Sequence, residues 1–213
     1  MIHLVDAILV LVLALNLFAL ATSRLSTVIR TVALQWVLLG LIPLLLHGHL
    51  SFLVLVVSGG AILIKGFVIP SILTRAMRDV KIKHEVHPRI GLPASMVLGA
   101  AATVFALVVA GQLPLSGEHA ATLLVPGSIA TVLVGFIFLT TRLKAISQAI
   151  GYLVLDNGVF VFGTLLAEAM PLIVEMGVLL DLLVGVFVIG IIVNHINRAF
   201  SSQDTSRLAS LKE

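Results

Sequence analysis

The stretches GYLVLDNGVFVFG, residues 151–163, and GVLLDLLVGVFVIG, residues 177–190, each place one aspartate in an apolar run. These aspartates, Asp156 and Asp181, lie in segments long enough to cross a bilayer, which takes about 20 apolar residues. A carboxylate at the centre of a transmembrane helix costs about 2.5 to 3.5 kcal/mol on insertion scales. Each acid therefore needs a partner, water or a function, and the two stretches predict a membrane protein built around buried charges.

The composition of the whole chain supports this class. Of its 213 residues, 60% are hydrophobic and only 11% are charged, whereas a soluble domain has about 25% charged residues. We therefore predict an all-α integral membrane protein. The chain has no cysteine, so it cannot itself provide thiolate ligands to zinc or Fe–S clusters, or form a disulfide. The chain has a net charge of +3. Its positive charges lie mainly in short loops, which is typical of membrane topology signals, so we predict no nucleic-acid binding.

Seven apolar segments are long enough to span a membrane, and they predict a compact bundle of about seven transmembrane helices. Their approximate bounds are 3–22, 27–46, 51–74, 92–113, 119–141, 145–166 and 171–197. The first segment lacks a basic start and an obvious cleavage site, so we expect it to remain as a helix. Twelve of the thirteen Lys and Arg residues lie on one side of this arrangement. The positive-inside rule then places the N-terminus outside and the C-terminus in the cytoplasm.

The thirteenth basic residue, Lys65, lies inside the third segment, close to Gly66 and Pro70. The glycine allows close helix contact, and the proline removes one helical hydrogen bond. A lysine that extends to the cytoplasmic interface is one interpretation, but Arg75 at that interface is about 15 Å away by helical rise. We favour a buried track in which this ammonium group and the acids share protons or water, and the alternative is a static ion pair that only holds helices together.

The acid of the sixth segment lies on a helical stripe of polar and aromatic residues. Tyr152 precedes Asp156 by one turn, and Asn157 follows it, so both are candidates for hydrogen bonding in the relay. The same stripe also contains Gln148 and Phe160. In the seventh segment, one face combines Asp181 with small residues that let a neighbouring helix approach, and it comprises Gly177, Asp181, Gly185 and Val188.

The histidines indicate a functional site less strongly than the buried acids do. His195 lies near the cytoplasmic end of the last segment, where a structural or interfacial histidine is the alternative to a secondary role in the relay. The long basic loop carries a possible metal motif without further ligands, formed by His84, Glu85 and His87. We predict no metal site, no bound cofactor and no catalytic residue, because neither a nucleophile elbow nor a phosphate-binding glycine loop is present.

Four stretches of the chain resemble the hydrogenase-4 membrane component E family, which is also found in formate hydrogenlyase assemblies. They are IKGFVIPSIL at 64–73, RLKAISQAIGYLVLDNGVFVFG at 142–163, LIVEMGVLLDLLVGVFVIGIIVNHI at 172–196 and DTSRLASLKE at 204–213. The resemblance covers nearly the whole chain. That family is in turn similar to the K-type subunit of respiratory complex I and to the C-type subunit of multisubunit cation/proton antiporters.

The resemblance implies a non-catalytic membrane subunit of a redox-driven, proton- or sodium-translocating complex in a prokaryotic cytoplasmic membrane. The [NiFe] and Fe–S centres would belong to partner subunits, together with antiporter-like membrane subunits and a membrane anchor similar to the H-type anchor of complex I. The K-type subunit carries a buried glutamate on each of its last two helices. Asp181 matches the second of these, whereas Leu153 stands at the first and Asp156 follows one turn later. The resemblance therefore favours Asp181 over Asp156 as the coupling acid.

The spacing of several residues also predicts an internal duplication. An offset of 118 residues places Gly40 on Gly158 and Lys65 within two residues of Asp181. We therefore divide the chain into residues 1–114, with four helices, and residues 115–213, with three helices similar to the K-type subunit and a cytoplasmic tail. On this argument Lys65 pairs with Asp181 first and with Asp156 second.

A free-standing cation/proton transporter is the alternative function. Two acids within the membrane are what a small exchanger needs, but seven spans with few polar residues leave little space for a substrate cavity.

Overall fold

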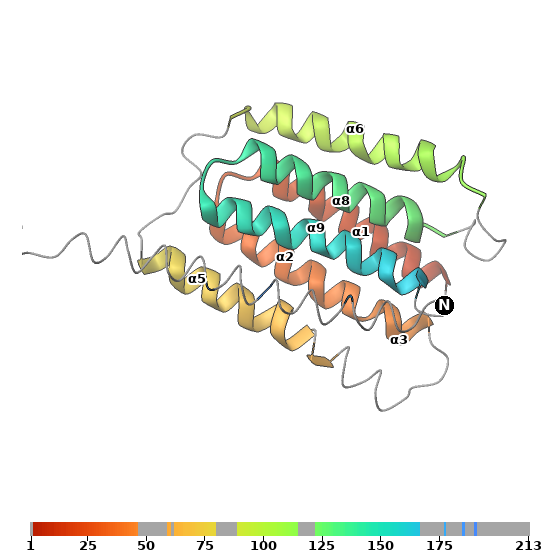
Figure 1. The fold of residues 1–213 in the computed structure, drawn as a ribbon, viewed down its shortest axis with the longest axis horizontal. Helices are drawn as coiled ribbons and strands as arrows, with labels where there is room; N and C mark the ends of the chain where they lie inside the picture. Colours follow the sequence, from red (N-terminus) through yellow and green to blue (C-terminus); the bar gives the residue numbers. More distant parts are fainter. Residues whose placement is uncertain are drawn as a thin grey trace, which may run out of the picture.

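The computed structural model describes residues 2–46, 59–60, 62–79, 89–114 and 122–166, together with the single positions 177, 185 and 190. All elements in these ranges are helical, which confirms the all-α prediction. They are α1 (Ile2–Ala21), α2 (Leu25–Gly40), α3 (Ile42–Leu46), the π-helix η1 (Ile62–Val68), α5 (Ile69–Asp79), α6 (Leu92–Ala110), α8 (Leu124–Thr141) and α9 (Ala145–Leu166). Figure 1 shows them running along one common direction.

Five helical segments in the described part of the chain are long and apolar enough to cross a membrane. They are His3–Ala21, Leu25–Leu45, Leu92–Ala110, Leu124–Thr141 and Ile146–Leu166. These segments match five of the seven predicted spans. The third predicted span is described only in part, as η1 and α5, and the seventh lies outside the described residues except for three positions. The count of seven and the orientation of the termini therefore stay predictions.

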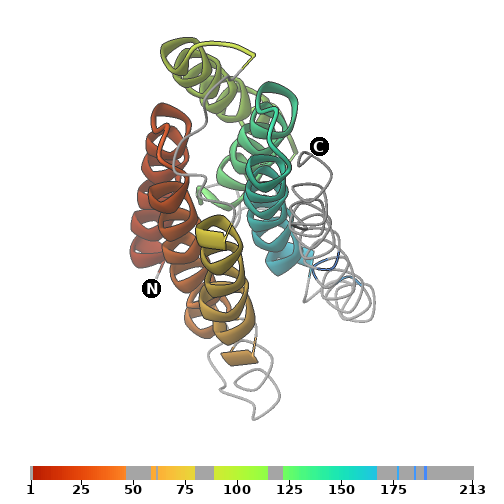
Figure 2. The ribbon, with the colours of Figure 1, turned by 90° about the vertical axis from the view of Figure 1, so that its left-hand side faces the viewer.

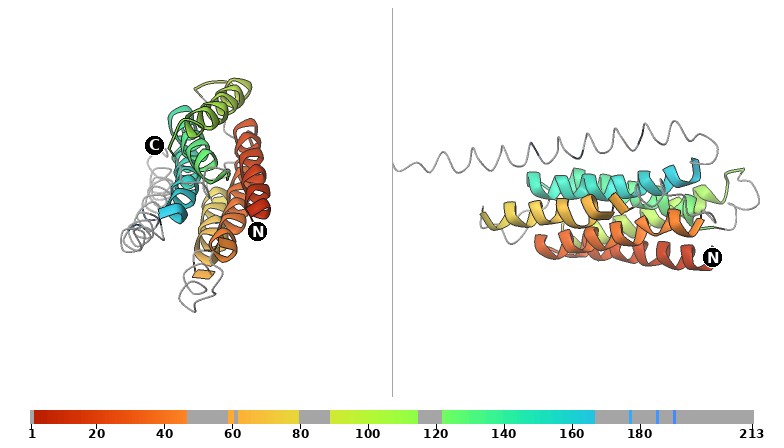
Figure 3. Two further views of the ribbon diagram at one scale, coloured as in Figure 1. Left: turned by 90° about the vertical axis from the view of Figure 1, so that its right-hand side faces the viewer. Right: turned by 90° about the horizontal axis from the view of Figure 1, so that it is seen from below.

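Two helical hairpins form the centre of the bundle. Residues 22–24 join α1 to α2, residues 142–144 join α8 to α9, and both connections lie at the same end (Figure 1). α1 contacts α8, and α2 contacts α9. Seen along the helices in Figure 2, α6 covers α1 and α8 at one edge, and α5 lies against α2 on the opposite side. The view from below in Figure 3 shows α2 running beside α5 and α9, both of which it contacts.

The hairpin of α8 and α9 is packed backbone against backbone through three glycines. A Cβ atom added at Gly151 would lie 2.7 Å from Phe138 Cβ, and one added at Gly158 would lie 2.6 Å from Val132 N. A Cβ at Gly135 would overlap the backbone of Leu155. Because backbone atoms cannot move aside as a flexible side chain can, these contacts fix the height and rotation of α9 against α8.

Helix α8 begins at Leu124, later than the predicted residue 119. Asp6 of α1 accounts for this start, because its Oδ1 accepts a hydrogen bond of 2.9 Å from the backbone N–H of Leu123. The first N–H groups of a helix have no partner within the helix, and a carboxylate there also interacts favourably with the helix dipole. Asp6 thus acts as a remote cap that joins the two hairpins at the end opposite their connections.

Candidate functional site

A buried ion pair lies between η1 and α9. Lys65 Nζ is 2.6 Å from Asp156 Oδ2, and the two residues are 8% and 6% exposed. This position does not fit a lysine that extends to the interface. Of the two predicted partners the structure pairs Lys65 with the second, Asp156, whereas Asp181 lies outside the described residues.

The π-helical geometry of η1 places Lys65 inside the bundle. Pro70 follows the π-helix and has no N–H to donate to the preceding turn, so the regular hydrogen-bond pattern is interrupted there. Gly66 then allows close approach to α2, because an added Cβ would lie 3.3 Å from Val37 Cγ2. Single π-helical turns frequently occur at functional sites. The proline was noted in the sequence, but the π-helix was not predicted.

The ammonium group also lies on an aromatic face. Lys65 Nζ is 4.1 Å from the centroid of the Trp36 ring, which is 1% exposed. The Trp36 and Phe160 rings are 5.0 Å apart and inclined at 58°. A cation over an indole face gains about 0.5 to 2 kcal/mol. Sequence reasoning missed Trp36. The signal that could have found it is that the single tryptophan of the chain lies inside an apolar span.

A second polar feature starts at the residue after Asp156 and crosses the bundle. Asn157 Nδ2 donates to Gln35 Oε1 (3.0 Å), and Gln35 Nε2 donates to Asn16 Oδ1 (2.9 Å). Asn16 Nδ2 then donates to Thr131 Oγ1 (2.9 Å). The three amide side chains are 0% exposed, and the chain of bonds joins α9, α2, α1 and α8. Asn157 was a sequence candidate, whereas the polar residues Gln35, Asn16 and Thr131 on the other three helices were missed.

Backbone carbonyls determine the direction of this chain of hydrogen bonds. Thr131 Oγ1 donates to Gly127 O (2.8 Å), so the hydroxyl must accept from Asn16. Gln35 Nε2 also donates to Val12 O (3.3 Å), which sets the orientation of the glutamine amide. The directed chain ends at Asn157 Oδ1, a buried acceptor with no hydrogen-bond partner among the described residues. The network therefore fixes the rotation of α9 next to Asp156.

The other predicted site residues differ in their positions. Tyr152 is half-buried on α9, one turn before Asp156, and Phe160 contacts Trp36. Gln148 is exposed and donates to Arg142 O (3.2 Å), so it stabilises the connection between α8 and α9. His195 lies outside the described residues, as do the three members of the histidine motif in the basic loop. Within the described ranges, no group of three His, Cys, Asp or Glu residues lies close enough together to hold a metal ion.

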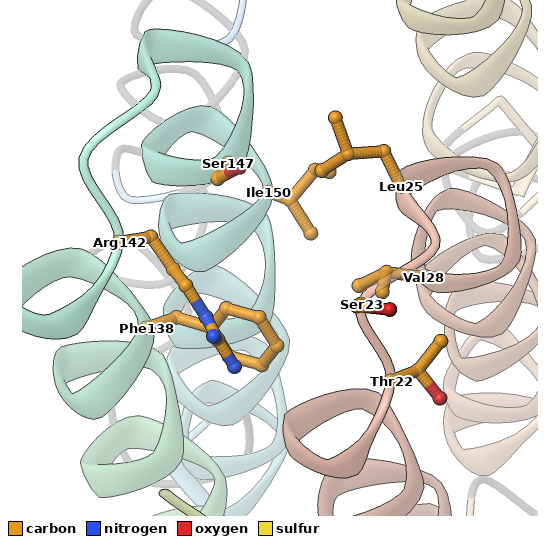
Figure 4. Close-up of a pocket in the computed structure, with 8 residues that line it drawn as sticks. All are labelled: Thr22, Ser23, Leu25, Val28, Phe138, Arg142, Ser147 and Ile150. Atoms are coloured by element: carbon orange, nitrogen blue, oxygen red, sulfur yellow. The ribbon is translucent and has the colours of Figure 1, made fainter. Parts of the chain in front are cut away.

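A small cavity lies at the end of the bundle where the two hairpin connections meet. Its volume is about 10 Å³, and it is lined by Thr22, Ser23, Leu25, Val28, Phe138, Arg142, Ser147 and Ile150. Figure 4 shows Arg142 lying along the ring of Phe138 and facing the other hairpin. This volume accommodates about one water molecule. The cavity is therefore too small for an organic substrate, and it belongs to the contact between the hairpins.

Comparison with known proteins identifies relatives of this chain. The "Uncharacterized protein Rv0085" of Mycobacterium tuberculosis (strain H37Rv) is 34% identical over 192 residues, which are 89% of this chain and 87% of that protein. The chain belongs to the family of this mycobacterial protein. More distant relatives are named hydrogenase-4 component E, from Escherichia coli (strain K12) and Shigella flexneri, each 28% identical over 74% of this chain and 73% of the relative.

These comparisons confirm part of the expected resemblance. This chain is related to hydrogenase-4 component E at a distance, as the motifs predicted. The described residues include five apolar helices long enough to span a membrane, and together with this relation they make the chain a membrane protein. No family model and no solved structure matches the chain. The relation to the K-type subunit of complex I and the C-type subunit of cation/proton antiporters stays a prediction.

Proposed function

We propose that this chain is a non-catalytic membrane subunit of a hydrogenase-4-type oxidoreductase complex, in which the Lys65–Asp156 pair forms part of an ion translocation path. Two findings support the assignment to such a complex. The chain is homologous to hydrogenase-4 component E over most of its length, and its helices are apolar enough to lie in a membrane.

The buried ion pair is the observation that carries the proposal. Asp156 lies near the middle of α9, and both members of the pair are almost fully buried. Replacing a buried ion pair by apolar residues is often neutral or stabilising, so stability alone does not explain its presence. Ionisable residues within membrane spans are rare, and they mark ion pathways and proton relays.

We propose a role for each residue. Asp156 is the group that gains and releases the ion, and Lys65 compensates its charge in the apolar interior. Trp36 holds the ammonium group in place with its ring face, and Asn157, through Gln35, fixes the orientation of the helix that carries the acid. Asp181 is the next proposed member of the path, with Tyr152, Asn157 and His195 as secondary members.

The proposed assembly places redox chemistry in other chains. The [NiFe] and Fe–S centres belong to peripheral partner subunits, and the membrane partners are antiporter-like subunits and an anchor of the complex I H-type. We propose seven spans in a prokaryotic cytoplasmic membrane, with the N-terminus outside. The exposed face of α6, which includes Val97, Val104 and Phe105, is available to lipid or to such a membrane partner.

The first test is co-purification. The full chain, tagged and extracted from native membranes in a mild detergent, should bring hydrogenase subunits with Fe–S centres, identified by mass spectrometry. Recovery of the chain alone, folded and able to exchange cations in liposomes, would instead support the free-standing transporter.

The second test addresses Asp156. In inverted membrane vesicles, Asp156→Asn keeps the shape of the side chain and removes its charge, so the complex should assemble while ion translocation per hydrogen turned over falls severalfold. Asp6→Asn is the matched control, because this acid on α1 caps α8 and its amide can still accept the Leu123 N–H. Unchanged translocation by an assembled Asp156→Asn complex would contradict the proposal.

A further inference from the structure

We infer that Lys65 determines the ion selectivity of this site: its ammonium group occupies the position at Asp156 that a sodium ion would take, so that the site exchanges protons and excludes Na⁺. This inference rests on the proposed role of Asp156 in translocation and adds the identity of the ion.

The contacts of Lys65 Nζ are those that an alkali cation would seek. The nitrogen lies 2.6 Å from a carboxylate oxygen of Asp156 and 4.1 Å from the centroid of the Trp36 ring. A carboxylate and an aromatic face both attract cations in an apolar setting. A second cation on the same carboxylate would lie within a few ångströms of the ammonium group, where like charges repel strongly because the interior screens them poorly.

The ligand that this position offers to a cation is the carboxylate of Asp156. Hard cations bind carboxylate oxygens. The ammonium group of Lys65 already lies 2.6 Å from Asp156 Oδ2, where such a cation would bind. The resident ammonium group is therefore what excludes Na⁺.

A proton meets no such obstacle, because it needs no coordination shell. A proton delivered by a neighbouring group forms an O–H bond with a carboxylate oxygen of Asp156 and gives a neutral carboxylic acid, while Lys65 keeps its charge. When the proton leaves to an acceptor, the carboxylate and the ion pair are restored. The ammonium group is covalently attached to η1, and η1 packs against α2 where Gly66 lies near Val37. It therefore cannot diffuse away as a bound ion could.

The test is carbodiimide labelling of Asp156 in membrane vesicles that hold the complete complex. Carbodiimides modify protonated buried carboxyl groups, and bound Na⁺ protects such groups, so the labelled peptide is measured by mass spectrometry in sodium chloride and in choline chloride at equal ionic strength. In the wild type, labelling should be the same in both salts. In Lys65→Met, Na⁺ should slow labelling severalfold, and in Lys65→Arg, which keeps a resident cation, it should have no effect.

Two outcomes overturn the inference. One is protection of Asp156 by Na⁺ in the wild type, and the other is the absence of protection in Lys65→Met. If Lys65→Met fails to assemble, Lys65→Gln serves in its place, and the wild-type comparison does not depend on either variant. Failure of the proposed function gives a separate signal, since an assembled Asp156→Asn complex would then translocate ions normally whatever the labelling shows.

Discussion

Two buried cations in the described part of this chain are held in different ways. Lys65 lies within the bundle, next to a carboxylate and over the ring of Trp36. Arg142 lies in the connection between α8 and α9, where it is 3% exposed; its Nη2 donates to Leu20 O (3.0 Å), and its Cζ is 5.4 Å from the centroid of the Phe138 ring. Both cations therefore stack on an aromatic ring, but Lys65 contacts a carboxyl group, whereas the hydrogen bond described for Arg142 goes to a backbone carbonyl.

This difference separates a structural charge from one that can take part in proton exchange. A guanidinium group stays protonated in proteins, so Arg142 is a fixed link between the end of α1 and the second hairpin. An ammonium group beside a carboxylate forms a pair in which a change of protonation changes the local charge. We therefore expect the two sites to respond differently to substitution.

Replacing Lys65 should have the largest effect. Lys65→Met leaves the carboxylate of Asp156 buried without its cation, and breaking a buried pair in this way costs about 3 to 5 kcal/mol. Unfolding of the full-length chain in lipid–detergent micelles measures the loss. Arg30→Met is the control, because it removes an exposed cation from α2. A loss no larger than that of the control would mean that the Lys65–Asp156 contact contributes little.

Replacing Arg142 should have a smaller effect on stability and none on translocation. Arg142→Met leaves the Leu20 carbonyl without its donor, and an unsatisfied neutral group costs about 1 to 3 kcal/mol. Unfolding and ion translocation per turnover are measured on the same preparation. The distinction between the two cations would be lost if assembled Arg142→Met complexes failed to translocate ions.

Replacing Trp36 should have the smallest effect. Trp36→Phe keeps an aromatic ring on α2 and only weakens the cation–π contact, so we expect the cation-dependent loss to be a fraction of the about 0.5 to 2 kcal/mol of a whole contact. The effect should disappear in a Lys65→Met background, which unfolding measurements on the two backgrounds will show. Phe105→Leu, at an exposed position on α6, is the control for loss of an aromatic side chain. An equal loss with and without Lys65 would show that Trp36 acts by packing alone.

The sequence was sufficient to predict the fold class, the five described spans and the burial of Lys65 and Asp156, because length, hydropathy and the cost of buried charge do not depend on how helices are arranged. The choice of partner does depend on that arrangement. Lys65 contacts Asp156, which the repeat argument placed second. The first choice, Asp181, lies outside the described residues and stays a prediction. The duplication itself stays a prediction, although two hairpins lie side by side.

The amide network was missed for a related reason. Asn16 and Gln35 carry no charge, so they cost less to bury than an acid and gave no comparable signal in the sequence. Their hydrogen bonds depend on four helices meeting at one height, which spacing along the chain does not reveal. The π-helix was likewise not predictable, since Pro70 shows that a hydrogen bond is lost but not how the preceding turn adapts.

The most direct test of the account is a double-mutant cycle on the buried pair. Stability and assembly are compared for the wild type, Lys65→Met, Asp156→Asn and the double variant. The account predicts that each single variant loses more stability than the double variant does, with a coupling energy of about 1 to 3 kcal/mol, because the double variant leaves no buried charge without a partner. Effects that add to within about 0.5 kcal/mol would show that Lys65 and Asp156 are not coupled and would contradict the proposed site.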